Sequence, residues 1–244
     1  MVGSMQNKKV LITRPGLAGR KLCKALESIG VKAVYFPTLL IKSVDINFDV
    51  SSDLLKKANL VIFISASAVH YAHDAGLLHD LGHAKIAVIG EATAASLKKV
   101  GIKIDVCPDE FNSEGLLLHV FLQNVGNKKI VIIRGQGGRA LLADTLKNRG
   151  ASMDYLEVYK REKPNNDITK TILDSVEIIL ITSQEAFKNL LLMTPLSLKP
   201  LLMTKEILVS SQALKECVEK QGLKIRTPLL KSAALSDIVW ALKH

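Results

Sequence analysis

An internal repeat limits the folds that this chain can adopt. Residues 8–30 read KKVLITRPGLAGRKLCKALESIG, and residues 128–150 read KKIVIIRGQGGRALLADTLKNRG. Each segment contains two lysines, a short apolar strand, an arginine, a turn with glycine and an amphipathic helix that ends at a glycine. Two copies of one supersecondary unit predict two similar domains that face a shared cleft, and we expect the functional site there.

The repeat continues in a circularly permuted order. Residues 60–72 (LVIFISASAVHYA) match residues 178–190 (IILITSQEAFKNL), since each segment joins an apolar strand to a serine-containing turn and a helix. Residues 86–104 (IAVIGEATAASLKKVGIKI) match residues 206–225 (EILVSSQALKECVEKQGLKI) in the same way. The N-terminal strand and helix therefore have their companions near the C-terminus and not in the segment that follows them.

This permuted order predicts that one domain is inserted into the other. We expect a discontinuous domain of residues 1–36 and 165–244 and an inserted domain of residues 43–157. Two linkers would join them, at about residues 37–42 and 158–164. The chain has 244 residues, which is long enough for each domain to bury a core of its own.

The apolar segments predict the fold class. Segments such as VLITR, LVIFIS, IVIIR and IILITS are nearly continuous apolar runs, which is typical of parallel strands that are covered on both faces. Helical patterns lie between these runs. We therefore predict an α/β protein that consists of two doubly wound, flavodoxin-like domains with parallel sheets.

The loops after the strands contain the candidate ligand-binding residues. In doubly wound sheets, ligands bind where the carboxyl ends of the strands lead into helices. Small and hydroxyl residues at these helix starts leave backbone N–H groups exposed, and the helix dipole favours anions there. The same serines and threonines are common N-caps, so capping alone remains an alternative. Arg14 and Arg134 end equivalent strands, and we expect at least one of them to face a ligand.

A formal net charge of +10 predicts an acidic partner. No helix-turn-helix, RNA-recognition or zinc-finger signature is present, so we expect no nucleic acid. A small polyanion suits the charge better, although a merely basic surface remains an alternative. No apolar run approaches the roughly 20 residues of a spanning helix and no secretory segment is recognisable, so we expect a cytoplasmic protein with no membrane partner.

Two further motifs suggest cofactors but lack supporting features. Residues 135–140 (GQGGRA) fit the GxGxxA dinucleotide pattern, yet the equivalent residues 15–19 do not, which argues against NAD. The cysteines have no CxxC spacing. Several histidines lie close together without an HExxH or carboxylate pattern, which favours a solvated helix over a metal site. These are His70, His73, His79 and His83.

Residues 134–162 (RGQGGRALLADTLKNRGASMDYLEVYKRE) resemble the central signature of the uroporphyrinogen-III synthase family. The signature consists of Arg-Gly-x-Gly-Gly-Arg, a leucine-spaced helix, Arg-Gly and a strand that ends in Val-Tyr-x-Arg. Other family landmarks are Thr-Arg-Pro at residues 13–15, Phe-x-Ser-x-x-Ala-Val at 63–69, Gly-x-x-Thr-Ala at 90–94 and Thr-Ser-x-x-Ala-Phe at 182–187. The resemblance extends over nearly the whole chain from Lys8.

The resemblance implies two α/β domains joined by a two-stranded linker. It also implies a cyclising hydro-lyase of haem biosynthesis. Its substrate would be hydroxymethylbilane, a linear tetrapyrrole rich in carboxylates, which closes to uroporphyrinogen III with loss of water and inversion of the terminal ring. Family members use no metal or organic cofactor. We expect a monomer that receives its substrate from hydroxymethylbilane synthase through a transient contact.

The resemblance also suggests the site residues. Tyr159 matches the tyrosine of the Val-Tyr-x-Arg motif and is the expected proton donor, with a half-buried structural tyrosine as the alternative. Thr93 matches a family threonine, with helix capping as the alternative, and the turn at residues 210–213 lacks the threonine that some relatives carry. The expected substrate-binding residues end strands or begin helices: Arg14, Ser65, Ser67, Gly90, Thr93, Arg134, Gly135, Ser183, Gln184 and Ser211.

A non-enzymatic protein of two domains that binds a small polycarboxylate is the alternative function. Such binding proteins usually carry a signal peptide or a DNA-binding headpiece, and the sequence shows neither. Formation of the type III isomer from the bilane distinguishes the two functions.

Overall fold

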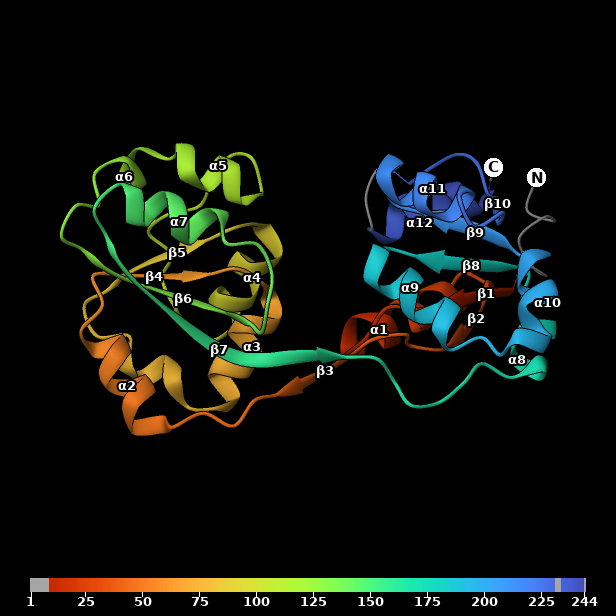
Figure 1. Ribbon diagram of the computed structural model, residues 1–244, viewed down its shortest axis with the longest axis horizontal. Coiled ribbons are helices and arrows are strands. Elements are labelled where there is room, and N and C mark those ends of the chain that lie inside the picture. Colours follow the sequence, from red (N-terminus) through yellow and green to blue (C-terminus); the bar gives the residue numbers. More distant parts are fainter. Residues whose placement is uncertain (1–8, 231–233, 244) are drawn as a thin grey trace. The chain divides into compact units, whose positions relative to one another are not determined.

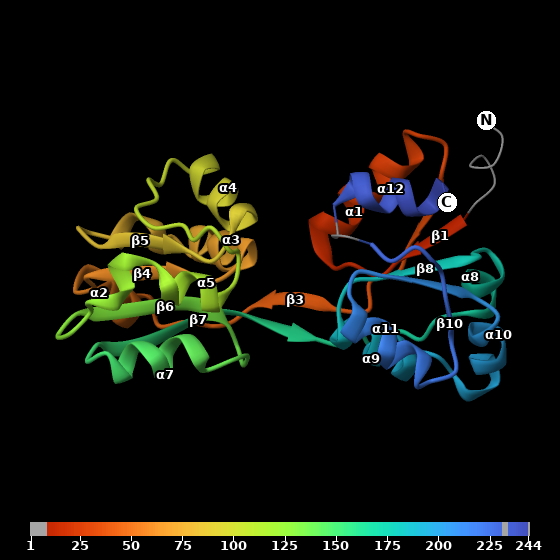
Figure 2. The same cartoon turned by 90° about the horizontal axis from the view of Figure 1, so that it is seen from above.

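The computed structural model describes residues 9–230 and 234–243. The chain forms two compact α/β units, each with a five-stranded sheet (Figures 1 and 2). Of the described residues, one unit contains 9–41, 162–230 and 234–243, and the other is the inserted unit, Lys42–Arg161. The chain passes from one unit to the other between Ile41 and Lys42 and between Arg161 and Glu162.

The discontinuous unit has a parallel sheet with the strand order β10-β9-β8-β1-β2. In chain order this is 2-1-3-4-5, the order of flavodoxin-like folds. Its strands are β1 (Lys9–Ile12), β2 (Lys32–Tyr35), β8 (Ile178–Ile181), β9 (Glu206–Val209) and β10 (Lys224–Ile225). Its helices are α1 (Gly16–Glu27), α8 (Lys170–Asp174), α9 (Gln184–Leu192), the 3₁₀ turn η2 (Leu196–Leu198), α10 (Lys199–Met203), α11 (Gln212–Glu219) and α12 (Leu235–Lys243).

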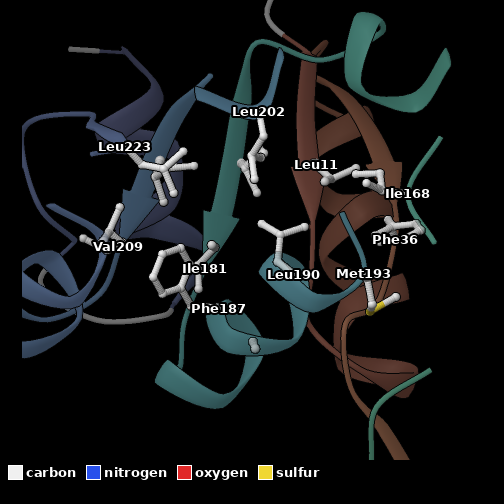
Figure 3. Packing of buried hydrophobic residues seen from close by; sticks show 14 of the residues in the cluster. Leu11, Phe36, Ile168, Ile181, Phe187, Leu190, Met193, Leu202, Val209 and Leu223 are labelled. Carbon is white, nitrogen blue, oxygen red and sulfur yellow. The ribbon is translucent and has the colours of Figure 1, made fainter. Parts of the chain in front are cut away.

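Both faces of this sheet are covered, which explains its apolar strands. Successive side chains of a strand point to opposite faces, so Leu11 contributes to one cluster while Val10 and Ile12 contribute to the other. Figure 3 shows the first cluster, in which Phe187 of α9 lies beside Ile181 of β8. Helices α1 and α12 cover the second face.

The inserted unit has the strand order β3-β7-β6-β4-β5. Neighbouring strands from β7 to β5 pair in parallel. Its strands are β3 (Leu40–Ser43), β4 (Leu60–Phe63), β5 (Lys85–Val88), β6 (Lys129–Gly135) and β7 (Ser152–Glu162). Its helices are α2 (Phe48–Lys56), α3 (Ala66–Asp74), the 3₁₀ turn η1 (Leu77–Asp80), α4 (Glu91–Lys99), α5 (Ser113–Leu118), α6 (Val120–Gln123) and α7 (Leu141–Asn148). Helices α5, α6 and α7 pack on one face of this sheet, and α3 lies on the opposite face (Figure 1).

The strand orders of the two sheets confirm the circularly permuted repeat. The order β9-β8-β1-β2 in one sheet corresponds to β5-β4-β6-β7 in the other, as the sequence matches require. Even the short β10 has a counterpart, because Val106 forms a parallel bridge to Ala87 at the edge of β5. The glycines that end the repeated helices all have positive φ, between 73° and 85°: Gly30, Gly101, Gly150 and Gly222. The predicted fold class is correct.

The helices of both units are short. Among residues 9–230 and 234–243, no helix has the length and apolarity needed to cross a membrane.

Candidate functional site

The carboxyl edge of the inserted unit's sheet contains a topological switch point. Strands β4 and β6 are neighbours, and the helices that follow them, α3 and α7, lie on opposite faces of the sheet (Figure 1). Ligands of doubly wound proteins bind at such points, because the two diverging connections leave a crevice between them. Ser65 follows β4, and Arg134 and Gly135 end β6, so sequence and topology place three predicted residues here.

Tyr159 reaches this edge from β7. The strand pairs regularly with β6 up to Arg134 and Glu157, after which the register shifts and Gly135 pairs with Tyr159. Such a bulge inserts an extra residue and re-aims the next side chain. Gln136 N–H donates to the Tyr159 carbonyl over 2.7 Å and holds the strand after the bulge. The side chain of Tyr159 is 1% exposed.

Gly135 is required by the position of the Tyr159 ring. A Cβ atom at Gly135 would overlap the ring of Tyr159, although its backbone does not lie in the left-handed region. The glycine therefore provides a close approach between β6 and an aromatic ring. On its other side, the ring stacks on Tyr71 of α3 with centroids 5.7 Å apart. Burial raises the pKa of Tyr71, and Asp74 adds to that shift.

Two polar side chains contact the Tyr159 hydroxyl. Ser65 Oγ lies 3.1 Å from Tyr159 Oη and also accepts the Ala68 N–H over 3.0 Å as the N-cap of α3. Arg161 Nη2 donates to Oη over 3.4 Å, and its guanidinium lies 5.7 Å from the ring centre. Because a guanidinium only donates, Oη accepts from Arg161 and keeps its own proton for Ser65 or a ligand.

A cavity of about 250 Å³ opens beside Tyr159 within the inserted unit. Its polar lining includes Arg134, Arg139 and Arg161 but neither Asp nor Glu, and its apolar lining comes mainly from β6 and α7. Arg134 is 5% exposed and stacks over the ring of Tyr155, 4.6 Å from its centroid. The cavity is therefore strongly cationic and suits an anion with an apolar part.

Three other predicted residues lie outside this cavity. Ser67 is partly buried in the first turn of α3, and Gly90 is the N-cap residue of α4. Thr93 lies three residues further along, within α4, and is 4% exposed. The capping alternative for Thr93 is therefore wrong, because Gly90 occupies the cap position. These residues follow β4 and β5 at the same edge of the sheet.

The remaining predicted residues lie at the carboxyl edge of the discontinuous unit's sheet. Ser183 caps α9 by accepting the Ala186 N–H over 3.1 Å, and Ser211 caps α11 by accepting the Leu214 N–H over 3.3 Å. Gln184, the first residue of α9, is exposed. Arg14 follows β1 and is partly buried, and this burial lowers the pKa of its guanidinium. The two serines are thus N-caps whose helix starts remain open to anions.

Sequence reasoning missed several residues around Tyr159 and the cavity. Arg161 was visible as the arginine of the Val-Tyr-x-Arg motif, but its contact with the phenol had no separate signal. Tyr155 and Ser113 line the cavity, and their positions depend on how β7 and α5 pack. Of the four clustered histidines, His70 and His73 have exposed side chains, and His70 Nε2 and His73 Nδ1 each lie 3.4 Å from a carboxylate oxygen of Asp74.

Comparison with known proteins identifies relatives of the whole chain. The family model of uroporphyrinogen-III synthase HemD matches residues 20–228. Uroporphyrinogen-III synthase of Salmonella typhimurium is 34% identical over 204 residues, which cover 76% of this chain and 80% of the relative. The Escherichia coli enzyme of the same name is 31% identical over 196 residues, with the same shares of the two chains covered.

Solved structures show the same fold. The chain matches uroporphyrinogen-III synthetase from Helicobacter pylori with a TM-score of 0.65 and 14% identity, covering 97% of this chain and 99% of the other. A mutant uroporphyrinogen III synthase from Thermus thermophilus matches with a TM-score of 0.63 and 18% identity, covering 97% of both chains. The residues matched by the family model include the switch point, the Tyr159 bulge and the cationic cavity. Together with the two relatives, this match shows that the chain belongs to the uroporphyrinogen-III synthase family.

Proposed function

We propose that Tyr159 is the proton donor with which this chain closes hydroxymethylbilane to uroporphyrinogen III. Membership of the family makes the chain a cyclising lyase of tetrapyrrole biosynthesis. The observation that supports the assignment is the phenol itself: it is buried, contacts Ser65 and Arg161 through its hydroxyl, and lines a cationic cavity at the switch point.

The reaction needs one proton at its start. The terminal hydroxyl of the bilane leaves as water when a proton is delivered to it, and a cationic azafulvene remains. The substituted carbon of the terminal pyrrole attacks the exocyclic carbon of this cation and gives a spiro intermediate. The bond between that pyrrole carbon and its original methylene bridge then breaks, and the ring closes again through its unsubstituted carbon, so that it is inverted. The pyrrole carbon that forms the last bond then loses its proton. The phenolate can accept this proton, so the tyrosine is regenerated and the overall change is loss of water.

The surroundings of Tyr159 suit this cycle. Arg161 donates to Oη in both protonation states and offsets the negative charge of the phenolate. Ser65 can donate or accept, because its hydroxyl can rotate while its oxygen still caps α3. General acid catalysis of this kind contributes roughly 10²–10⁴-fold. The remaining acceleration comes from holding the bilane in the folded arrangement that leads to inversion.

The substrate's carboxylates would be bound by the strand ends and helix starts of both units. Backbone N–H groups at a helix N-terminus favour anions, and side chains nearby add specificity. We propose that Ser65, Ser67, Gly90, Thr93, Arg134 and Gly135 of the inserted unit and Arg14, Ser183, Gln184 and Ser211 of the discontinuous unit bind the bilane. We further propose a cytoplasmic monomer that can receive the bilane from hydroxymethylbilane synthase by transient contact.

The isomer ratio of the product tests the function, and one matched pair of variants tests the donor. Fresh hydroxymethylbilane is supplied, and the oxidised porphyrins are separated by chromatography. We expect type III product from the wild type. In Tyr159→Phe, kcat should fall by about 10²-fold while residual product stays type III, because folding of the bilane decides inversion. Tyr35→Phe is the matched control, because it removes a hydroxyl that donates to the Gly16 carbonyl over 3.3 Å in the other unit and should leave kcat nearly unchanged.

The isomer ratio tests the synthase function, and the kcat of Tyr159→Phe tests the identity of the proton donor, so the two hypotheses can be rejected separately. If the wild type yields only type I product, the chain is not acting as a synthase and the polycarboxylate-binding alternative gains support. If Tyr159→Phe is folded and keeps normal kcat, the chain is still a synthase but Tyr159 is not its proton donor.

A further inference from the structure

We infer that the cavity beside Tyr159 is a pocket for a single pyrrole ring of the substrate, with Arg134 binding a carboxylate on that ring. The inference rests on the proposed function for the identity of the ligand, but the pocket lies wholly within residues 64–161. Three observations carry it: a buried guanidinium without a counter-ion, a glycine loop that leaves its terminal nitrogens accessible, and an apolar lining of suitable size.

The environment of Arg134 calls for an anion. Arg134 is only 5% exposed, and its Nε donates to the Gly135 carbonyl over 3.0 Å. Within residues 9–230 and 234–243, no carboxylate forms an ion pair with Arg134 or with the nearby Arg161. Burial of a charge without a partner is costly. The planar fork of an arginine matches a carboxylate with two parallel hydrogen bonds, so a ligand carboxylate would satisfy this group.

The loop after β6 leaves room for such a ligand. Gly137 and Gly138 both have positive φ, 73° and 101°, which other residues adopt only with strain. A Cβ atom at Gly138 would lie 2.7 Å from Arg134 Nη2. The absence of this side chain keeps the terminal nitrogen accessible from the cavity. Arg139, the next residue, already pairs with Glu114 over 2.5 Å, so Arg134 is the better candidate for the anion.

The rest of the lining suits a flat ring. The cavity has walls of Ile64, Ile89, Ile132 and Leu142, and Tyr155 lies beneath the guanidinium. A volume of about 250 Å³ corresponds to roughly eight water molecules in the liquid. That space holds one substituted pyrrole and is far too small for four. Tyr159 lines the same cavity, so the bound ring would lie beside the proposed proton donor.

A monopyrrole tests the pocket without any catalytic step. Porphobilinogen carries an acetate and a propionate arm on one pyrrole, and its dimethyl ester removes both charges. We expect wild-type protein to bind porphobilinogen, measured by NMR titration, and to bind the ester at least about tenfold more weakly. Arg134→Met should raise the Kd for porphobilinogen about tenfold or more. With hydroxymethylbilane, the same variant should raise KM by a similar factor and change kcat little.

Arg149→Met is the matched control. Arg149 belongs to the same unit, donates to the Leu117 and Leu122 carbonyls over 2.9 and 3.0 Å, and does not line the cavity. Its loss should leave the Kd for porphobilinogen unchanged. If Arg134→Met does not fold, Arg134→Lys tests the pocket instead. Lysine keeps the positive charge but lacks the forked pair of donors, so it should still raise the Kd for porphobilinogen several-fold.

The outcomes distinguish this inference from the proposed function. Type III product from a wild type that does not bind porphobilinogen, or that binds it equally well after Arg134→Met, overturns the pocket and leaves the synthase intact. Arg134-dependent binding in a protein that forms only type I product supports the pocket while the proposed function fails.

Discussion

At the scale of single residues, Ser65 and Ser183 illustrate how one repeated position acquires an additional role. Both follow a strand, both cap a helix, and each accepts the N–H of the residue three positions ahead. Ser65 alone of the two also contacts a phenol, Tyr159 Oη at 3.1 Å. The pair therefore separates the effect of a lost cap from the effect of a lost contact with the proposed donor.

We expect Ser65→Ala and Ser183→Ala to lower the free energy of unfolding by similar amounts, about 1 kcal/mol each, because each removes an N-cap. Ser65→Ala should in addition lower kcat by roughly fivefold, since it removes a hydrogen bond of about 1 kcal/mol that orients the Tyr159 hydroxyl. Urea denaturation and steady-state kinetics measure the two effects. A kcat of Ser65→Ala equal to that of the wild type would show that Ser65 only caps its helix.

At the scale of elements, the pairing of β6 with β7 determines where Tyr159 points. The register shift between Arg134 and Gly135 brings Tyr159 opposite the glycine and lets the ring lie against the backbone of β6. The sequence of neither strand reveals this register shift, because a bulge is defined by how the residues of one strand pair with those of its neighbour.

Gly135→Ala should therefore displace the Tyr159 ring. We expect the free energy of unfolding to fall by about 1–3 kcal/mol from overpacking, and kcat to fall about as far as in Tyr159→Phe. Gly126→Ala is the control, because a Cβ there meets its nearest neighbour at 3.8 Å, an ordinary contact. Denaturation, kinetics and product isomers are compared for both variants. A Gly135→Ala protein with full kcat would mean that the close approach has no part in catalysis.

At the scale of the whole molecule, the net charge of the protein can attract a charged substrate before the two come into contact. The formal charge of +10 attracts a polycarboxylate and raises its concentration near the protein. This attraction concerns encounter and binding, and it does not change the chemical step.

Added salt should therefore raise KM for hydroxymethylbilane much more than it lowers kcat. The Debye length falls from about 10 Å at 0.1 M to about 3 Å at 1 M ionic strength, which screens the attraction. Initial rates across a potassium chloride series measure the effect, and sucrose at matched osmolarity controls for solvent changes. A fall in kcat at constant KM would assign the salt effect to protein stability instead of substrate attraction.

The sequence by itself determined the fold class and the permuted order of the repeated segments. Continuous apolar runs mark strands buried on both faces, and the helix-ending glycines mark each repeat. The permuted match predicted that the N-terminal strand has its companions near the C-terminus, and β1 pairs with β8 in the structure. The parallel strands predicted further that Arg134, Gly135 and Ser65 lie at the carboxyl ends of strands.

Only the tertiary structure decided how those residues meet. The contact between Ser65 and Tyr159 spans 94 positions, Arg134 is buried beside a cavity, and Gly90, not Thr93, caps α4. Local propensity and apolar periodicity depend on near neighbours in the chain, so they leave traces in sequence. Hydrogen bonds, burial of a charge and the shape of a cavity depend on register and packing between elements, and these exist only once the chain has folded.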